Sequence, residues 1–233
     1  MTDERVPADS STPAAPSARS CVRRLPERAR YDEASIHAIL DDGVVAHVGF
    51  VVDGQPYVVP TLHARVGGSV FLHGSPGSRA MRVLGSGAPA CLTVTRLDGL
   101  VLARSAFHHS VNYRSVVVLG TAVPVTEREE KLRALETLVE RVAPGRWAEV
   151  RAPNDRELAL TAVLRLDLGE ASVKLRTGGP VDDEADLASG AWAGVVPVDT
   201  SAGDPVPSAD LDPAILPSPA VRALLDRYAR RSG

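Results

Sequence analysis

The stretch Gln55–Arg82, QPYVVPTLHARVGGSVFLHGSPGSRAMR, predicts a β-hairpin that runs directly into a helix. Gly67-Gly68 separates two runs that are rich in β-branched residues, which is typical of a two-residue hairpin turn. Ser75 suits the N-cap position of the following helix, and Pro76 suits its first helical position. The order strand, turn, strand, helix is therefore the pattern from which the rest of the fold is predicted.

The start of this helix has the features of a phosphate site. The amides of Gly77 and Ser78 are expected to point out of the helix start, where the helix dipole favours an anion. Arg79 and Arg82 lie three residues apart, so both guanidinium groups share one face of the first turn. An ordinary strand-turn-helix connection with solvated arginines explains the same residues equally well, so the pattern alone leaves both interpretations open.

Composition excludes several classes of function. The chain has 233 residues, 44% hydrophobic and 24% charged, as in an ordinary globular protein. Its net charge of -3 gives no electrostatic case for binding nucleic acid or an anionic membrane. We find no apolar run long enough for a membrane span and no signal-peptide core, so a cytoplasmic location is expected. The two cysteines form no disulfide framework, and Cys91 is expected to be a buried apolar residue.

Turn signals divide the chain into three parts. Residues 1–22 are rich in Ser, Pro and Ala and are expected to be poorly ordered. Residues 23–199 form the folded domain, and residues 200–233 form a proline-rich arm that ends in an amphipathic helix. Strands outnumber helices and hairpin signals recur. The fold class predicted is therefore mainly β (α+β), an antiparallel barrel with helices packed outside.

Other local signals place helices and ligand-facing residues. A helix is expected at 32–41, and a second one is expected to begin with a capping box formed by Thr126 and Glu129. One face of strand 55–66 is more polar than the other and is the better candidate to meet a ligand. This face carries Tyr57, Val59, Thr61, His63 and Arg65. A two-residue turn would pair His63 with Leu72, whereas a one-residue slip would pair it with His73.

The hairpin and helix resemble the FMN-binding split-barrel family, which contains pyridoxamine 5′-phosphate oxidases and nitroimidazole-resistance reductases. Members carry a proline-containing strand along the flavin, here Val58–Thr61. A second strand follows with an aromatic-x-His pattern, here Phe71–Gly74, and then a helix start whose arginine holds the phosphate, here Gly77–Arg79. The resemblance covers about residues 24–198. It is closer to the nitroimidazole-resistance branch, because Ala80 stands where the oxidases have a second basic residue.

Two later motifs extend the resemblance. The run Ser110–Gly120 is similar to a barrel strand that lies beside the flavin and the dimer interface. The run Ser172–Pro180, followed by Trp192–Pro197, resembles a C-terminal signature that relatives use near the flavin, often from the second subunit. An ion pair at the barrel rim is an alternative role for Arg114, and core packing is an alternative role for Trp192.

The resemblance implies a homodimeric split β-barrel that binds FMN in a groove between subunits. No metal site is expected, because no His/Cys/Asp cluster has ligand spacing. The cofactor-binding residues implied are Val59, Pro60, Thr61, Leu62, His63, His73, Ser78, Arg79, Arg82, Asn112, Arg114, Lys174, Arg176 and Trp192.

Two functions follow from this resemblance. The first is an FMN-dependent oxidoreductase that takes hydride from NAD(P)H and reduces a small conjugated or nitroaromatic substrate. A flavin accepts hydride itself, so no catalytic residue is assigned. The second is a non-catalytic split-barrel module that carries a flavin or haem as a sensor or store. Reduction of the bound flavin by a nicotinamide distinguishes the two.

Overall fold

The computed structural model describes residues 13–229. Most of the segment predicted to be a poorly ordered tail, residues 1–12, lies outside the described residues. Residues 13–22 contact the folded domain: the Ser17 hydroxyl donates to Glu170 at 2.7 Å, and the Val22 amide donates to the Tyr31 hydroxyl at 2.9 Å. In the described part of the chain, no helix is both long enough and apolar enough to cross a membrane.

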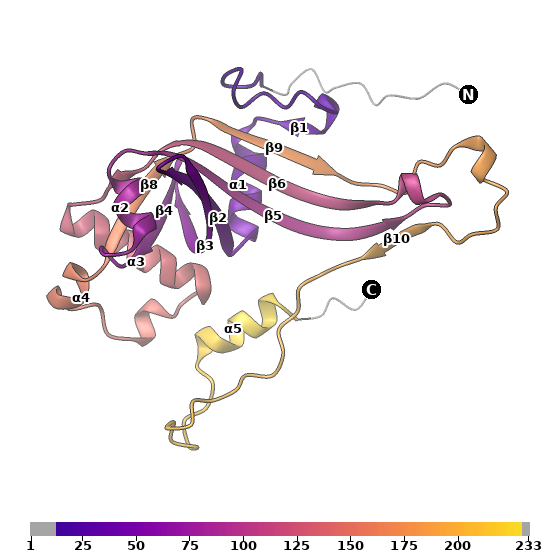
Figure 1. The fold of residues 1–233 in the computed structure, drawn as a ribbon. Coiled ribbons are helices and arrows are strands. Elements are labelled where there is room, and N and C mark those ends of the chain that lie inside the picture. Colours follow the sequence, from indigo (N-terminus) through magenta and orange to yellow (C-terminus); the bar gives the residue numbers. More distant parts are fainter. Residues whose placement is uncertain (1–12, 230–233) are drawn as a thin grey trace.

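A coiled antiparallel sheet forms the centre of the molecule, with helices packed outside it (Figure 1). The strand order is β1-β9-β6-β5-β2-β3-β4-β8-β7, and β10 pairs with β5. The strands are β1 (Ala29–Arg30), β2 (Val45–Val52), β3 (Gln55–Val66), β4 (Ser69–Gly74), β5 (Pro89–Leu102), β6 (Ser110–Thr121), β7 (Val123–Pro124), β8 (Ala162–Asp167), β9 (Ala171–Arg176) and β10 (Gly194–Pro197). The helices are α1 (Glu33–Asp42), α2 (Arg79–Gly85), α3 (Arg128–Val142), α4 (Asp155–Ala159) and α5 (Pro219–Arg227). The predicted fold class is confirmed.

The hairpin β3–β4 has the predicted two-residue turn, and His63 pairs with Leu72. Strand β2 pairs with β3 so that Val48 lies opposite Val59 and Phe50 opposite Tyr57. Val48 and Phe50 are buried in the main core, and their partners pack against the same core. The β3 face that was predicted to meet a ligand therefore faces the core over much of its length.

Alternation along β5 explains a second departure from prediction. Leu92 and Val94 point into the core and are 0% exposed, so Cys91 points out and is exposed. The expectation that Cys91 is buried is therefore wrong. The residues around Cys91 are apolar, which is why it was expected to be buried. Which face of a strand is covered depends, however, on the elements that pack against it.

Helix α3 covers the outer face of β3 and β4. A small second core forms there from Phe71, Val125, Ala134 and Val163. The predicted capping box is wrong, because α3 begins after Glu127 and this N-cap makes no side-chain hydrogen bond. The next helix, α4, carries a capping box instead, in which Asn154 and Glu157 bond to each other's backbone amides at 2.9 Å.

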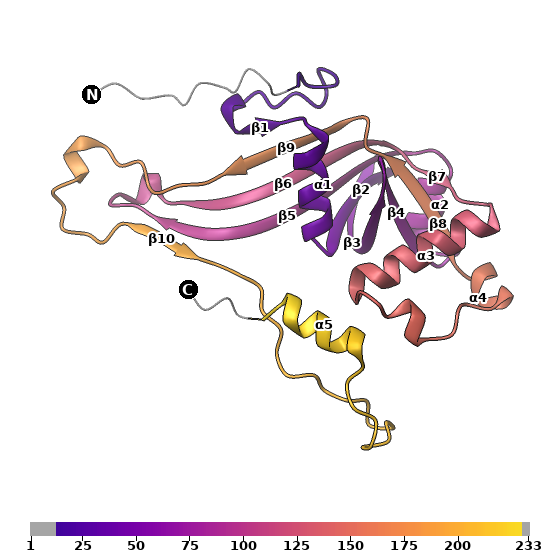
Figure 2. The same cartoon turned by 180° about the vertical axis from the view of Figure 1, so that it is seen from behind.

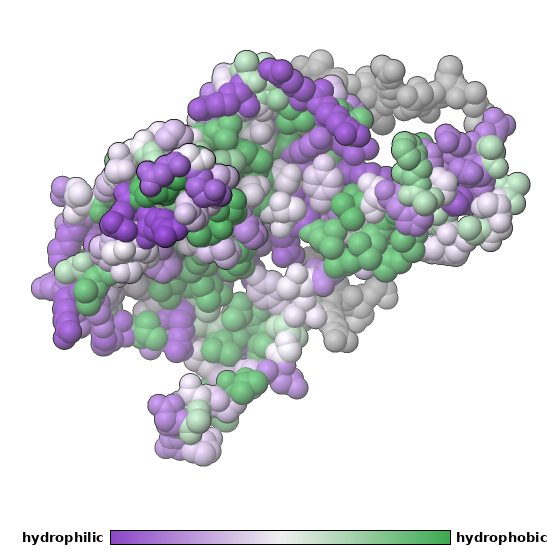
Figure 3. Space-filling model, in the orientation of Figure 1, coloured by the Kyte–Doolittle hydropathy of each residue, from purple (hydrophilic) through white to green (hydrophobic). Residues whose placement is uncertain are grey.

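Strands β5 and β6 continue beyond the barrel as a long projecting ribbon, with β9 and β10 beside them (Figure 1, Figure 2). A register shift between Leu97 and Gly99 lets β5 run as one bent strand rather than two. Leu100, Val111 and Val196 lie in register across this ribbon, each about two-fifths exposed. Figure 3 shows hydrophobic residues gathered over this part of the molecule.

Candidate cofactor pocket

A cavity of about 590 Å³ lies between the end of α3 and the outer face of the β3–β4 hairpin. Its walls are largely apolar, and its mouth carries two arginines, so it has the size and character of a small-molecule site. Its lining residues are Leu62, His73, Leu135, Leu138, Val139, Val142, Ala143, Arg146, Trp147, Val150, Arg151, Pro153, Glu157 and Thr161.

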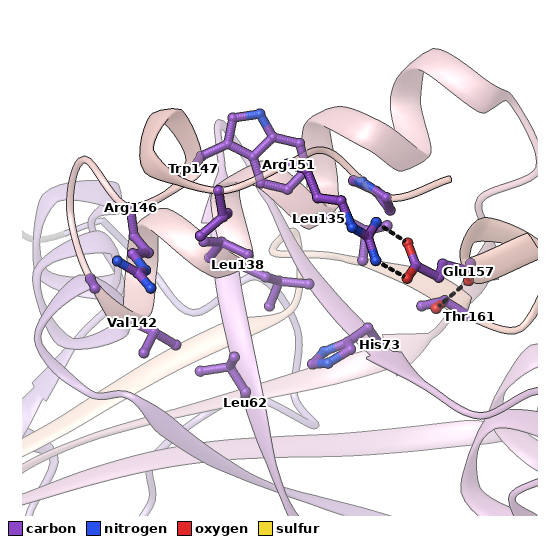
Figure 4. A pocket seen from close by; sticks show the side chains of 14 residues that line it. Leu62, His73, Leu135, Leu138, Val142, Arg146, Trp147, Arg151, Glu157 and Thr161 are labelled. Carbon is purple, nitrogen blue, oxygen red and sulfur yellow. Dashed lines mark hydrogen bonds and ion pairs between the residues drawn. The ribbon is translucent and has the colours of Figure 1, made fainter. Parts of the chain in front are cut away.

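The register of the β3–β4 hairpin determines which side chains form the floor of the pocket. His63 pairs with Leu72, so Leu62 and His73 stand one step further along and point to the opposite side of the sheet. That side also carries Phe71, which packs under α3. Side chains of α3, among them Leu135 and Leu138, lie across the cavity from Leu62 and His73, which form its floor (Figure 4).

His73 is the one titratable group on this floor without a partner within the described residues. Its Nδ1 atom is buried and has no hydrogen-bond partner. Burial lowers the pKa of His73, so its imidazole is neutral at neutral pH. A neutral imidazole nitrogen with a free lone pair is a metal ligand, and the close-up shows the ring at the bottom of the cavity (Figure 4).

The mouth of the pocket is basic but internally balanced. The Arg151 guanidinium donates two hydrogen bonds to Glu157, at 2.8 and 2.6 Å. Together with the hydrogen bond from the Asn154 amide, they lower the pKa of Glu157 to about 2. Arg146 donates one hydrogen bond to Glu149 at 3.0 Å. Both guanidinium groups are thus held at the edge of an apolar cavity, where they can meet an anionic group of a ligand (Figure 4).

The start of α2 differs from the predicted phosphate site. The helix begins at Arg79, three residues later than predicted, because the Ser78 side chain caps it by accepting from the Met81 amide. The Gly77 amide donates to the Ser75 hydroxyl at 3.4 Å, and the Ser78 amide donates to the Ser75 carbonyl at 3.0 Å. These two amides therefore bond within their own turn.

The arginines of α2 remain candidates for an anion. The guanidinium of Arg79 stacks on the Tyr57 ring, 4.7 Å from its centroid. Arg79 and Arg82 are exposed, and neither has a carboxylate within 4.0 Å among residues 13–229. A phosphate at this end of the barrel would meet these side chains rather than the amides of Gly77 and Ser78.

The predicted residues on β3 separate onto two faces. Val58 is 66% exposed, and Pro60 is exposed beside it on the outer face of the sheet. Val59 packs against the core on the other face. His63 is 0% exposed, and its Nε2 lies 3.0 Å from the Leu40 carbonyl of α1, so this histidine is closed off from any ligand. The sequence could not predict which β3 residues face the core, because both faces of the strand are rich in apolar residues. The pairing register determines it.

The C-terminal predicted residues form two separate groups. Arg176 is buried and donates to the side-chain oxygen of Asn112 and to the carbonyls of Gly178 and Gly179. It has no carboxylate partner within the described chain, and burial lowers its pKa. Arg114 instead lies in an ion-pair cluster on the rim, which was the alternative foreseen for it.

Lys174 and Trp192 have other neighbours. The Lys174 ammonium donates to the Arg24 carbonyl at 2.9 Å. Trp192 is 65% exposed and its ring covers Gly194, where an added Cβ would lie 2.9 Å from the indole. The core-packing alternative for Trp192 is therefore wrong, because β10 pairs at the edge of the projecting ribbon.

The sequence predicted two residues of this pocket, Leu62 and His73, but not the rest of it. Its walls come from residues 135–161, which are distant in sequence from the hairpin. The signal available was the leucine stripe of α3 followed by Arg146-Trp147, and that stripe also describes an ordinary packed helix. Among residues 13–229 no three His, Cys, Asp or Glu side chains are grouped as a metal site, so His73 is a single candidate ligand.

Comparison with known protein families shows the family of this chain. The family model described as Pyridoxamine 5′-phosphate oxidase matches residues 32–175, and the chain belongs to this family. No match is found among curated proteins.

Solved structures extend this comparison. The flavocytochrome Anf3 from Azotobacter vinelandii is 40% identical, with a TM-score of 0.85, over 91% of this chain and 98% of that one. The FAD and heme binding protein from Mycobacterium smegmatis is 40% identical, with a TM-score of 0.82, over 84% and 97%. A putative 5-nitroimidazole antibiotic resistance protein from Bacteroides thetaiotaomicron shares the fold, at 20% identity and TM-score 0.54, over 63% and 85%.

Proposed function

We propose that this protein is a redox protein that binds a flavin and a haem, and that His73 would hold the haem iron. The observation that carries the proposal is the His73 imidazole on the floor of an apolar cavity, because this ring makes no hydrogen bond within the described residues. Two relatives at 40% identity support it, since one is named a flavocytochrome and the other an FAD and heme binding protein.

The residues of the pocket fit a haem. Leu135, Leu138 and Val139 offer an apolar wall for a porphyrin, and His73 offers a neutral imidazole. Arg146 and Arg151 lie at the mouth of the cavity. Their guanidinium groups could pair with the two carboxylates of a haem where these reach the mouth. The proposal thus gives each chemical part of the cofactor a partner of matching character.

We place the flavin on the outer sheet face around Pro60, with its phosphate near Arg79. The relative from Mycobacterium smegmatis is named for FAD, so we propose FAD rather than the FMN that the motifs imply. Val45, Val51 and Val58 give this face an exposed apolar surface of the kind that a second copy of the chain covers. A homodimer that closes over the flavin therefore remains part of the proposal.

Division of roles follows from these positions. A bound flavin supplies hydride and electron chemistry, and a bound haem supplies one-electron chemistry. The chain holds each group, excludes water from the His73 pocket and keeps that imidazole unprotonated. NAD(P)H as the hydride source and a small conjugated or nitroaromatic acceptor remain our proposal for the reaction. Reduction of the purified protein by either nicotinamide tests it, and failure with both favours a carrier or sensor.

The haem assignment is tested by titrating haemin into the cofactor-depleted protein and following the Soret band. We expect His73→Ala to lose the spectrum of the His-ligated species, whereas His109→Ala, at the exposed end of the ribbon, leaves it unchanged. Equal spectra for wild type and His73→Ala would refute the assignment.

The flavin assignment is tested independently by extracting the cofactor and separating FAD from FMN. Arg79→Ala should weaken flavin binding by roughly 1.5–3 kcal/mol if its guanidinium bonds to a phosphate. Arg133→Ala, on the exposed side of α3, is the matched control. An unchanged dissociation constant for Arg79→Ala would move the phosphate elsewhere.

A further inference from the structure

The C-terminal helix docks beside the mouth of the His73 pocket. The Ser218 hydroxyl donates to Glu149 Oε2, and the Ala220 amide donates to Glu149 Oε1 at 3.0 Å. Ala220 is only 3% exposed. These hydrogen bonds lower the pKa of Glu149, so its carboxylate stays charged at neutral pH and holds the first turn of α5.

The same carboxylate holds an arginine of the pocket. Arg146 Nη1 donates to Glu149 Oε2 at 3.0 Å and lies 3.4 Å from the Ser218 hydroxyl. Its other guanidinium nitrogens have no hydrogen-bond partner within residues 13–229. Arg146 also lines the cavity (Figure 4). One end of this guanidinium is therefore fixed by Ser218 and Glu149, while the other end can serve a ligand.

The far end of α5 is also attached to the domain. Arg227 donates to the Asp41 carbonyl at the end of α1 at 3.3 Å. The Tyr228 carbonyl accepts from the Ala202 amide at 3.0 Å, which closes the arm on its own helix. Because α5 is held at both ends, the Ser218 contact is part of a docked segment rather than an isolated surface bond.

We propose that α5 is a strap that positions Arg146 to bind a carboxylate of the pocket's ligand, with Ser218 and Glu149 as the positioning residues. The proposal rests on the proposed haem site and deepens it. A guanidinium already held in one rotamer loses less conformational entropy on binding than a free one. Removing the Ser218 hydroxyl should therefore weaken a ligand that bears carboxylates, by about threefold to tenfold.

Binding and docking must be coupled in both directions. If a docked α5 strengthens ligand binding, then ligand binding must stabilise the docked α5 by the same factor. Haemin should therefore slow tryptic cleavage after Arg222 and Arg227. This readout reports on the strap itself and does not depend on turnover.

The experiment compares Ser218→Ala with two controls in the full-length protein. Ser218→Thr keeps a hydroxyl at the cap, and Ser208→Ala removes an exposed serine from the same arm. Each protein is titrated with haemin and with haem dimethyl ester, which lacks free carboxylates. We expect only Ser218→Ala to bind haemin about threefold to tenfold more weakly, and we expect all four proteins to bind the diester alike.

Two results would overturn the strap. Haemin binding by Ser218→Ala that equals wild type removes any positioning role, and equal weakening toward haemin and the diester reduces Ser218 to a structural cap. Failure of the haem site itself looks different, because wild type and His73→Ala would then bind haemin alike. In that case the proposed function and the strap both fall.

Discussion

Acidification should destabilise the fold through His63. The Leu40 carbonyl can only accept, so His63 Nε2 carries the proton and Nδ1 is the bare nitrogen. That Nδ1 is buried without a partner within the described chain, and the side chain is 0% exposed. Burial lowers the pKa of His63, and the nearby positive charge of Arg141 lowers it further, whereas the Leu40 bond opposes both.

The sign and size follow from proton linkage. The folded-state pKa lies below the unfolded value near 6.5, so between these values the unfolded chain binds more protons. Stability is therefore complete above pH 6.5 and falls as the pH drops toward the folded-state pKa. One such group contributes a slope of at most about 1.4 kcal/mol per pH unit.

Chemical denaturation of the cofactor-free protein between pH 7.5 and 5, at one protein concentration, measures this slope. His63→Leu removes the titrating group, so its unfolding free energy should depend less on pH by up to that amount. The variant His109→Ala, at the exposed end of the ribbon, serves as the control, because the His109 ring is exposed. Parallel pH profiles for wild type and His63→Leu would refute the reasoning.

Three further changes test the packing around the site. Leu138→Ala should cost about 2–5 kcal/mol of unfolding free energy and enlarge the His73 pocket, because Leu138 is 2% exposed; a smaller loss in thermal denaturation would show that α3 packs loosely. Asn154→Ala should cost about 1 kcal/mol by removing one half of the α4 capping box, and restoration by Asn154→Asp checks the cause. Gly99→Ala should displace β10, since the new Cβ would lie 2.9 Å from Val195; unchanged amide exchange along β10 would contradict this.

Much of the local structure could be predicted because it depends on neighbours in sequence. The turn at Gly67-Gly68 needs a positive φ, which Gly67 adopts at 55°, and this fixes the hairpin. The α4 capping box likewise uses groups only three residues apart. The Thr126 and Glu129 pair matched the same pattern and failed, because α3 is held by Phe71 and Val163 beneath it rather than by its cap.

The sequence by itself determined the β-rich fold class, the family and the position of His73 in the second strand of the hairpin. Only the tertiary structure decided which strand faces are open, since a shift of one residue exchanges the two faces of every strand. It also assembled the pocket, because its floor comes from residues near 62–73 and its walls from residues 135–161. Local patterns cannot specify such contacts, which depend on how α3 and the sheet pack across the whole chain.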